Sequence, residues 1–301
     1  MSNSKFADPR DITSESEFRA LCIIQRVSAS LSICGSAYII WEILGNDPNR
    51  KKRSSVYHRI MLVLSLFDIA SSIALFFGNW AMPRDTEYSF IYESYGNMFS
   101  CRVQGFLILL GWCGVVACNT FLSLNFLMAV KYNYSNIELK QKIERPLHAV
   151  LLLFCLPLSL LPFVWNLFNE GVCFCFIGTY PRECSKYQNI ELECVRGDPS
   201  AYRVISLLVL GLPGPIAFVG ISVSMILVYR TVKYQEREAK RFARDSTMHR
   251  LSVHSRKIFW RGFWYLISFS VVWITAFLVH LLGNSIAIQI IAKFLLPLQG
   301  M

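Results

Sequence analysis

The side chains best placed to do chemistry in this sequence are polar groups set inside long apolar stretches. Asp68 lies among leucine, isoleucine and phenylalanine residues, and Asn125 and Lys293 have similar neighbours. A charge kept away from water is costly, so each of these groups needs a reason to be there. Asp68 is expected to bind a hydroxyl or amide such as Ser65 or Asn125, or to pair with Lys293. Alternatively, Lys293 reaches water along its own stem.

No arrangement of residues typical of an enzyme is found. The sequence has no phosphate-binding loop, no His-Glu-x-x-His helix and no supported Ser-His-Asp set, and its five histidines are scattered. Cys173, Cys175 and Cys184 are close in sequence, but they lack the paired spacing usual for zinc ligands. We therefore expect neither an enzyme nor a metal site.

The elements that must position these groups are long apolar helices. Hydrophobic residues make up 54% of the 301 residues and charged residues 17%, whereas soluble domains carry nearer a quarter charged residues. A helix of about 20 apolar residues crosses a bilayer. Six runs reach that length: 21–44, 60–82, 101–130, 147–167, 205–229 and 258–282.

A seventh apolar run, 286–301, stops at the last residue of the sequence and would cross only about two thirds of the membrane. The sequence therefore predicts an all-α bundle of seven transmembrane helices with an incomplete seventh helix. A soluble protein with buried core helices is the alternative, and the number and length of the runs argue against it.

Lysine and arginine residues are concentrated in the first, third and fifth connections between the runs. Such loops stay in the cytoplasm, so residues 1–20 are expected to form a short extracellular tail. Because the basic residues lie between apolar runs, the net charge of +10 indicates membrane topology rather than nucleic-acid binding. Arg26, Glu42 and Arg261 lie near span ends and are expected to extend to the interface. We expect a multi-pass protein of the plasma membrane, with the lipid bilayer as a partner.

The ten cysteines divide by position. Five fall inside the apolar runs, where they are expected to behave as small apolar residues: Cys22, Cys34, Cys113, Cys118 and Cys155. Five fall on the extracellular side, where disulfides persist: Cys101, Cys173, Cys175, Cys184 and Cys194. Five is an odd number, so one extracellular thiol is expected to remain unpaired.

Several short motifs, in order along these spans, resemble those of G-protein-coupled receptors. They are Leu64-Ser65-Leu66-Phe67-Asp68, Gly96-Asn97-Met98-Phe99-Ser100-Cys101 with Gln104-Gly105-Phe106, Cys175-Phe176-Ile177 with Tyr180-Pro181 and Cys184, and Pro297-Leu298-Gln299-Gly300. The resemblance covers nearly the whole chain. It is closest to the branch of unicellular eukaryotes that is similar to cyclic-AMP receptors and mixes secretin-like with rhodopsin-like features.

The resemblance implies roles for particular residues. Cys101 and Cys175 would tie the second extracellular loop over the bundle, and Cys184–Cys194 would form a second bridge. Asp68, Asn125 and Lys293 would belong to an intramembrane polar network or sodium site. Four further residues would form the switch or line the ligand pocket: Trp112, Trp273, Pro297 and Gln299.

The sequence also departs from the rhodopsin-like pattern. Asn125-Phe126-Leu127 stands where the acid-Arg-aromatic triplet would close the third helix, Trp273 lacks the following proline of the sixth-helix switch, and Asn-Pro-x-x-Tyr is missing. Lys293 is placed much as the retinal-binding lysine of light receptors, but neutral Gln104 stands where a carboxylate counter-ion is needed. We therefore do not expect retinal or any other cofactor.

The expected function is reception of an unknown extracellular ligand and signalling to a heterotrimeric G protein. The expected G-protein-facing residues are basic: Lys131, Arg230, Arg237, Lys240, Arg241 and Arg244. The same residues could simply be a solvated loop near anionic lipid headgroups. A transporter or channel would need inverted repeats and several facing charges at the membrane midplane, which the sequence lacks. A receptor fragment that does not signal is the remaining alternative.

Overall fold

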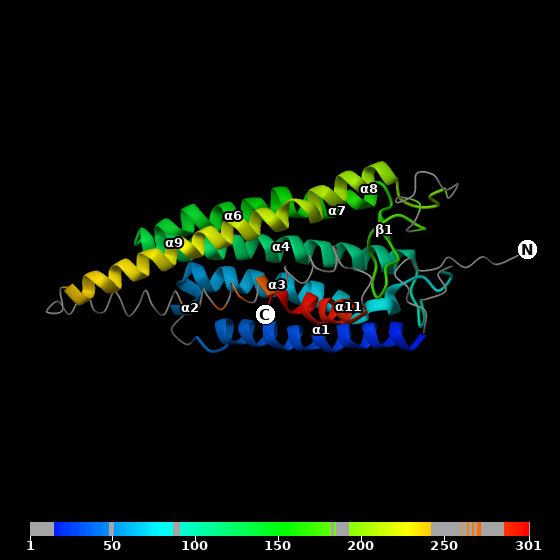
Figure 1. The fold of residues 1–301 in the computed structure, drawn as a ribbon, viewed down its shortest axis with the longest axis horizontal. Coiled ribbons are helices and arrows are strands. Elements are labelled where there is room, and N and C mark those ends of the chain that lie inside the picture. Colours follow the sequence, from blue (N-terminus) through cyan, green and yellow to red (C-terminus); the bar gives the residue numbers. More distant parts are fainter. Residues whose placement is uncertain are drawn as a thin grey trace, which may run out of the picture.

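The long helices lie side by side in an elongated bundle (Figure 1). The computed structural model describes residues 15–47, 51–86, 91–181, 184, 193–241, 260, 264, 267, 270–271 and 286–300. Among these residues, five helices are long and apolar enough to cross a membrane. Large apolar side chains such as Leu153, Val219 and Ile216 are exposed on their outer faces, as expected for surfaces that face lipid. The protein is an all-α membrane helical bundle.

The first three spans are continuous helices. They are α1 (Glu15–Leu44), α3 (Val56–Phe77) with its 3₁₀ extension η1 (Gly78–Ala81), and α4 (Met98–Lys131). A short helix, α2 (Lys51–Ser54), precedes α3. Helix α1 begins at Glu15, so it includes residues that the sequence assigned to the extracellular tail.

The fourth and fifth spans contain π-helical turns. The fourth consists of α5 (Asn136–Leu139), η2 (Lys140–Glu144), α6 (Arg145–Val150), η3 (Leu151–Cys155) and α7 (Leu156–Val164), and the fifth of α8 (Pro199–Ser206), η5 (Leu207–Gly211) and α9 (Pro213–Arg241). Both begin before their apolar runs because polar residues cap their first turns. The Ser135 hydroxyl accepts a hydrogen bond from the backbone N–H of Glu138, and the Asp198 carboxylate accepts those of Ser200 and Ala201.

The last described helix is α11 (Ile286–Leu295), followed by the 3₁₀ turn η6 (Leu296–Gly300). It packs against α1, and the Ser28 hydroxyl donates a hydrogen bond to the Phe294 carbonyl. Most of the sixth predicted run, 258–282, lies outside the described residues.

The main core lies between α3, α4, the fourth span and α9. Helices α3 and α4 approach closely at Gly111, where an added Cβ would lie 2.5 Å from the Cβ of Ser71. Lipid tails are as apolar as most side chains, so helices in a membrane associate mainly through close packing, and small residues at the contact allow it. A two-stranded hairpin of β1 (Phe168–Asn169) and β2 (Phe176–Ile177) lies at the end of the bundle where α1 begins (Figure 1).

Candidate functional site

A loop tied down by disulfides lies over the outer end of the bundle. Cys175 is joined to Cys101 in the first turn of α4, with 5.3 Å between the Cα atoms. Cys173 is joined to Cys22 of α1, with 5.4 Å between the Cα atoms. Cys184 and Cys194 form a third disulfide. The two cysteines on either side of Phe174 therefore fix the loop to two different helices.

The Cys22–Cys173 disulfide corrects the sequence analysis in two respects. Cys22 was expected to be a small apolar residue of the first span, and one extracellular cysteine was expected to be unpaired. Because Cys22 is near the outer end of α1, it meets the loop and completes an even set of six. The odd count of five extracellular cysteines was the clue in the sequence, because a sixth partner would have to come from the end of a span.

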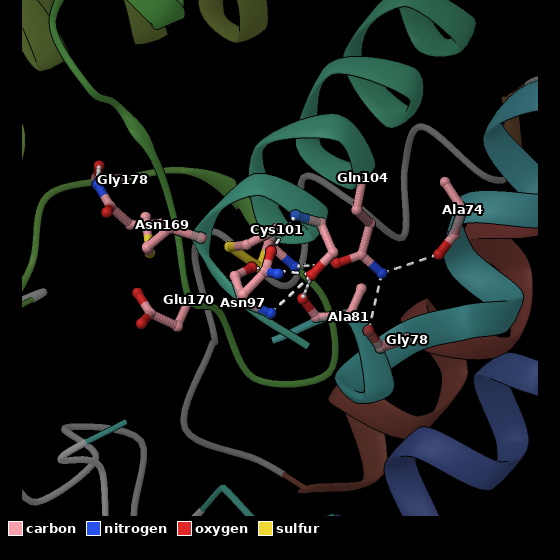
Figure 2. Close-up of a disulfide and its surroundings, with 12 residues drawn as sticks. Ala74, Gly78, Ala81, Asn97, Cys101, Gln104, Asn169, Glu170 and Gly178 are labelled. Atoms are coloured by element: carbon pink, nitrogen blue, oxygen red, sulfur yellow. Dashed lines mark hydrogen bonds between the residues drawn. A yellow bond between two sulfur atoms is a disulfide. The ribbon is translucent and has the colours of Figure 1, made fainter. Parts of the chain in front are cut away.

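Gln104 links the loop to two helices, as Figure 2 shows. Its side-chain oxygen accepts the backbone N–H of Cys175 at 2.8 Å, and its nitrogen donates to the carbonyls of Ala74 at 2.9 Å and Gly78 at 2.7 Å. The side chain is buried, so these bonds replace those it would make with water. Sequence reasoning noted Gln104 only as a neutral residue and missed this bridging role.

The start of α4 is set by an N-terminal cap beside the disulfide. The Asn97 side chain accepts the backbone N–H of Ser100 at 2.9 Å, and the Ser100 hydroxyl accepts the backbone N–H of Asn97 at 2.8 Å. Ser100 also donates to the carbonyl of Ala81 at the end of η1. These contacts fix where Cys101 lies relative to the end of the preceding span (Figure 2).

An ion pair between a buried carboxylate and a partly exposed arginine stabilises the far side of the loop. The Arg196 guanidinium donates to both carboxylate oxygens of Glu170, at 2.9 and 3.0 Å, and the Glu170 side chain is only 1% exposed. Arg196 also lies over the Tyr180 ring, with its Cζ 4.1 Å from the centroid. Asn169 donates to the carbonyls of Asn166 and Gly178. The loop is therefore held by charge-assisted and neutral hydrogen bonds as well as by disulfides.

Two cations lie beneath this loop. The Arg26 guanidinium stacks 3.8 Å above the Trp80 ring and donates to the Asn79 side chain. The Lys293 ammonium lies 4.1 Å from the centroid of the Phe174 ring. Arg26 therefore binds two residues of η1 at the end of the α3 span, and Lys293 contacts the disulfide-tied loop.

Asp68 is fully buried and binds two hydroxyl groups of α1. Its Oδ2 accepts hydrogen bonds from Ser32 and Ser36, both at 2.6 Å. A hydroxyl partner was expected from the sequence, with Ser65 as one example, but the two hydroxyls that bind Asp68 belong to α1. Ser28, Ser32 and Ser36 recur every four residues along α1, and this polar stripe was the signal that could have identified them.

Other buried polar groups in the middle of α3 and α4 make no hydrogen bond within the described part of the chain. They are the hydroxyls of Ser65 and Ser72, both amide atoms of Asn119, and Oδ1 of Asn125. All four residues are at most 4% exposed. We call them the mid-bundle polar set.

The predicted switch residues are only partly described. Trp112 packs against the main core, and Pro297 is buried in η6. Gln299 lies in η6, and Trp273 lies outside the described residues. The structure does not bring Trp112 and Pro297 into a described contact.

The predicted cytoplasmic residues lie at the opposite end from the loop. Lys131 ends α4, and Arg230 and Arg237 are exposed on α9. Lys240 and Arg241 are in the last turns of α9, and Arg244 lies outside the described residues. Arg59 makes a bidentate ion pair with Glu144, which joins α3 to the fourth span.

The helical bundle, with a disulfide-tied hairpin over one end, has a rhodopsin-like fold. The structure of squid rhodopsin matches it with a TM-score of 0.67 and 13% sequence identity, covering 100% of this chain and 81% of that one. At this identity the likeness concerns the fold. No protein-family model matches the sequence, and a search of curated proteins finds no match.

Proposed function

We propose that this protein is a receptor that transmits an extracellular signal to a heterotrimeric G protein. The observation that carries the proposal is the likeness of its fold to squid rhodopsin over the whole chain. In this proposal the ligand binds in the outer half of the bundle, below the loop tied by Cys173 and Cys175. Binding shifts the balance between two helix packings and exposes the cytoplasmic ends of α4 and α9 to the G protein.

The polar interior supports a receptor with two packings. Asp68 joins α1 to α3, while the mid-bundle polar set has no hydrogen bonds within the described residues. A buried polar group without a partner costs about 1–3 kcal/mol. A second packing that supplied partners would therefore lie close in free energy to this one.

The finer assignment within this proposal is the branch similar to cyclic-AMP receptors. It rests on the sequence motifs around Cys101, Cys175 and Pro297 and on the missing rhodopsin-like triplet at Asn125-Phe126-Leu127. The protein is placed in the plasma membrane because its signal is proposed to come from outside the cell.

Nucleotide exchange tests the function. The purified chain in lipid nanodiscs is mixed with each main class of G protein, and uptake of a non-hydrolysable GTP analogue is timed. We expect acceleration with at least one class, and less of it for the variant Asp68→Leu. Solute flux through liposomes containing the protein, with no exchange for any class, would instead support a transporter or channel.

The proposed receptor carries no cofactor. Lys293 faces the Phe174 ring, and Gln104 is a neutral amide held by three hydrogen bonds. The proposal rests on Gln104, which stands where a retinal-binding receptor needs a carboxylate, because a neutral amide does not stabilise a protonated Schiff base. Incubation with 11-cis-retinal is expected to give no visible absorption band, and a band that disappears in Lys293→Gln would refute this.

A further inference from the structure

Two lysines at the end of the bundle opposite the hairpin are held against a pair of stacked tyrosines. The rings of Tyr132 and Tyr134 stack with their centroids 5.7 Å apart and their planes at 30°. The Lys142 ammonium lies 4.1 Å from the centroid of the Tyr134 ring and donates a hydrogen bond of 2.9 Å to its hydroxyl. The Lys131 ammonium lies 5.2 Å from the centroid of the Tyr132 ring. The four side chains therefore form one continuous set of contacts, which we call the lysine–tyrosine array.

The backbone that follows α4 brings the two rings together. Asn133, between the tyrosines, has a φ of +51°, in the left-handed region that asparagine enters more readily than most residues. The backbone N–H of Tyr134 donates to the Met128 carbonyl in the last turn of α4, so the turn closes onto the helix. Tyr134 also packs against the main core. The array is thus a folded part of the chain rather than a set of unrelated surface side chains.

The positive charge around the array is only partly balanced by the acids of the same segment. Residues 131–148 contain four lysines and arginines, all of them exposed, and two glutamates. Glu144 is paired with Arg59 of α3. Glu138 accepts hydrogen bonds from the backbone N–H and the hydroxyl of Ser135, and its charge offsets one of the four. Three positive charges therefore remain in excess in this segment.

The array lies at the level of lipid headgroups. Lys131 directly follows the apolar run 101–130, and Lys142 lies five residues before the apolar run 147–167. Five residues of helix span about 8 Å, which is about the thickness of the headgroup layer beside the hydrocarbon core. Farther along the same span, Leu152 and Leu153 are 63% and 79% exposed. The fourth span thus offers charge to a headgroup and apolar surface to the acyl chains of the same lipid.

We infer that the lysine–tyrosine array is a docking site for the headgroups of anionic phospholipids. A lysine ammonium has three N–H donors and Lys142 uses one on Tyr134, so two remain for phosphate oxygens. The ring contacts hold the flexible lysine side chains in place before a lipid arrives, which lowers the entropy lost on binding. Tyrosine also suits this level of the membrane, because its ring is apolar and its hydroxyl is polar.

Lipid binding to the full chain tests the site without any G protein. The purified protein in a neutral detergent is titrated with dioctanoyl phosphatidylglycerol, and the bound lipids are counted by native mass spectrometry. Dioctanoyl phosphatidylcholine, whose headgroup has no net charge, is the control lipid. We expect the first phosphatidylglycerol to bind about tenfold more tightly than phosphatidylcholine or better, because each lysine near an anionic surface contributes about fivefold.

Two lysines of the same segment distinguish a built site from a general basic surface. Lys142→Gln removes a charge that the array holds and should weaken phosphatidylglycerol binding about fivefold. Lys140→Gln removes the same charge from an exposed lysine that lies over no ring among the described residues, and it should weaken binding less than about twofold. Tyr132→Leu keeps every charge but removes one stacked ring, and we expect about threefold weaker binding. Because Tyr132 is 53% exposed, this variant should still fold.

Three results would overturn this assignment: equal binding of the two lipids, equal weakening by Lys140→Gln and Lys142→Gln, or unchanged binding in Tyr132→Leu. An absence of any preference for phosphatidylglycerol, together with slower nucleotide exchange in Lys142→Gln, would assign the array to an acidic surface of the G protein and would also overturn it.

Discussion

Gln104 at the outer end of the bundle and Asn119 in its middle are both buried amides, but they differ in the hydrogen bonds that they make. At the outer end, Gln104 makes three hydrogen bonds and Glu170 makes two with Arg196. In the mid-bundle polar set, Asn119 makes none within the described residues. The bonds of Gln104 and Glu170 therefore fix the loop, although some buried atoms at this end, such as Oδ1 of Asn169, make no hydrogen bond within the described residues. In the middle of the bundle, a different helix packing could supply hydrogen bonds to Asn119 and so lower the free energy.

This comparison separates two tasks of a receptor. A rigid outer end presents a fixed site to a ligand, because disulfides and charge-assisted bonds limit how the loop can move. A middle with unmet hydrogen bonds favours a second arrangement of similar free energy. Variants that affect the two regions should therefore differ in the sign of their effect as well as in its size.

Removing a disulfide should have the largest effect. Replacing Cys101 and Cys175 together by alanine removes a disulfide between residues 74 positions apart. The unfolded chain then gains conformational entropy, which predicts a decrease of about 4–5 kcal/mol in the free energy of unfolding. Removing the Cys184–Cys194 disulfide, whose cysteines are 10 positions apart, should lower the free energy of unfolding by about 3 kcal/mol. Thermal unfolding of the purified variants measures both. If removing Cys184–Cys194 lowers the stability more than removing Cys101–Cys175 does, then strain or local packing, and not chain entropy, determines how much each disulfide stabilises the protein.

Breaking the ion pair between Arg196 and Glu170 should have the next largest effect on stability. Arg196→Gln leaves the Glu170 carboxylate buried without its cation, and we expect a loss of about 3 kcal/mol. The double variant Glu170→Gln with Arg196→Gln has no buried charge and should recover more than half of that loss. Arg203→Gln, an exposed arginine of α8, is the control. If the double variant is no more stable than Arg196→Gln alone, then the unpaired charge of Glu170 is not the cause of the lost stability.

A matched pair of leucine variants tests the comparison directly. Gln104→Leu leaves the Cys175 N–H unsatisfied and should destabilise the protein by about 1–3 kcal/mol. Asn119→Leu removes a buried amide that has no described partner, so it should stabilise this packing by about 1 kcal/mol and slow nucleotide exchange. Thermal midpoints and exchange rates are measured on the same preparations. If both variants destabilise the protein, then the buried amides of the two regions do not differ in their effect on stability.

The sequence predicted the helices better than their contacts. Apolar runs placed five of the spans because length and composition alone decide which segments suit a bilayer. The starts of the fourth and fifth spans were not predicted, because Ser135 and Asp198 cap polar turns that a search for apolar runs leaves out. The resemblance to receptors supplied the Cys101–Cys175 pair, which the structure contains.

Partners across helices were harder to predict. Asp68 binds Ser32 and Ser36 because of the way α1 and α3 face each other, and no local pattern around Asp68 contains that information. Cys22 was assigned to the membrane interior because its neighbours are apolar, although its position near the end of α1 brings it to the loop. Lys293 meets Phe174 for the same reason: the loop reaches down to α11.

The smallest effect on stability is expected at the cytoplasmic end, where the comparison predicts a change in signalling alone. Lys131 and Arg237 are exposed, so Lys131→Gln and Arg237→Gln should each change stability by no more than about 0.5 kcal/mol. If these residues face a G protein, the variants should slow nucleotide exchange and make it less sensitive to salt, because rim charges act mainly on association. Arg203→Gln removes the same charge at the outer end and controls for net charge. Equal slowing by all three variants would mean that overall charge, and not a cytoplasmic docking surface, sets the rate.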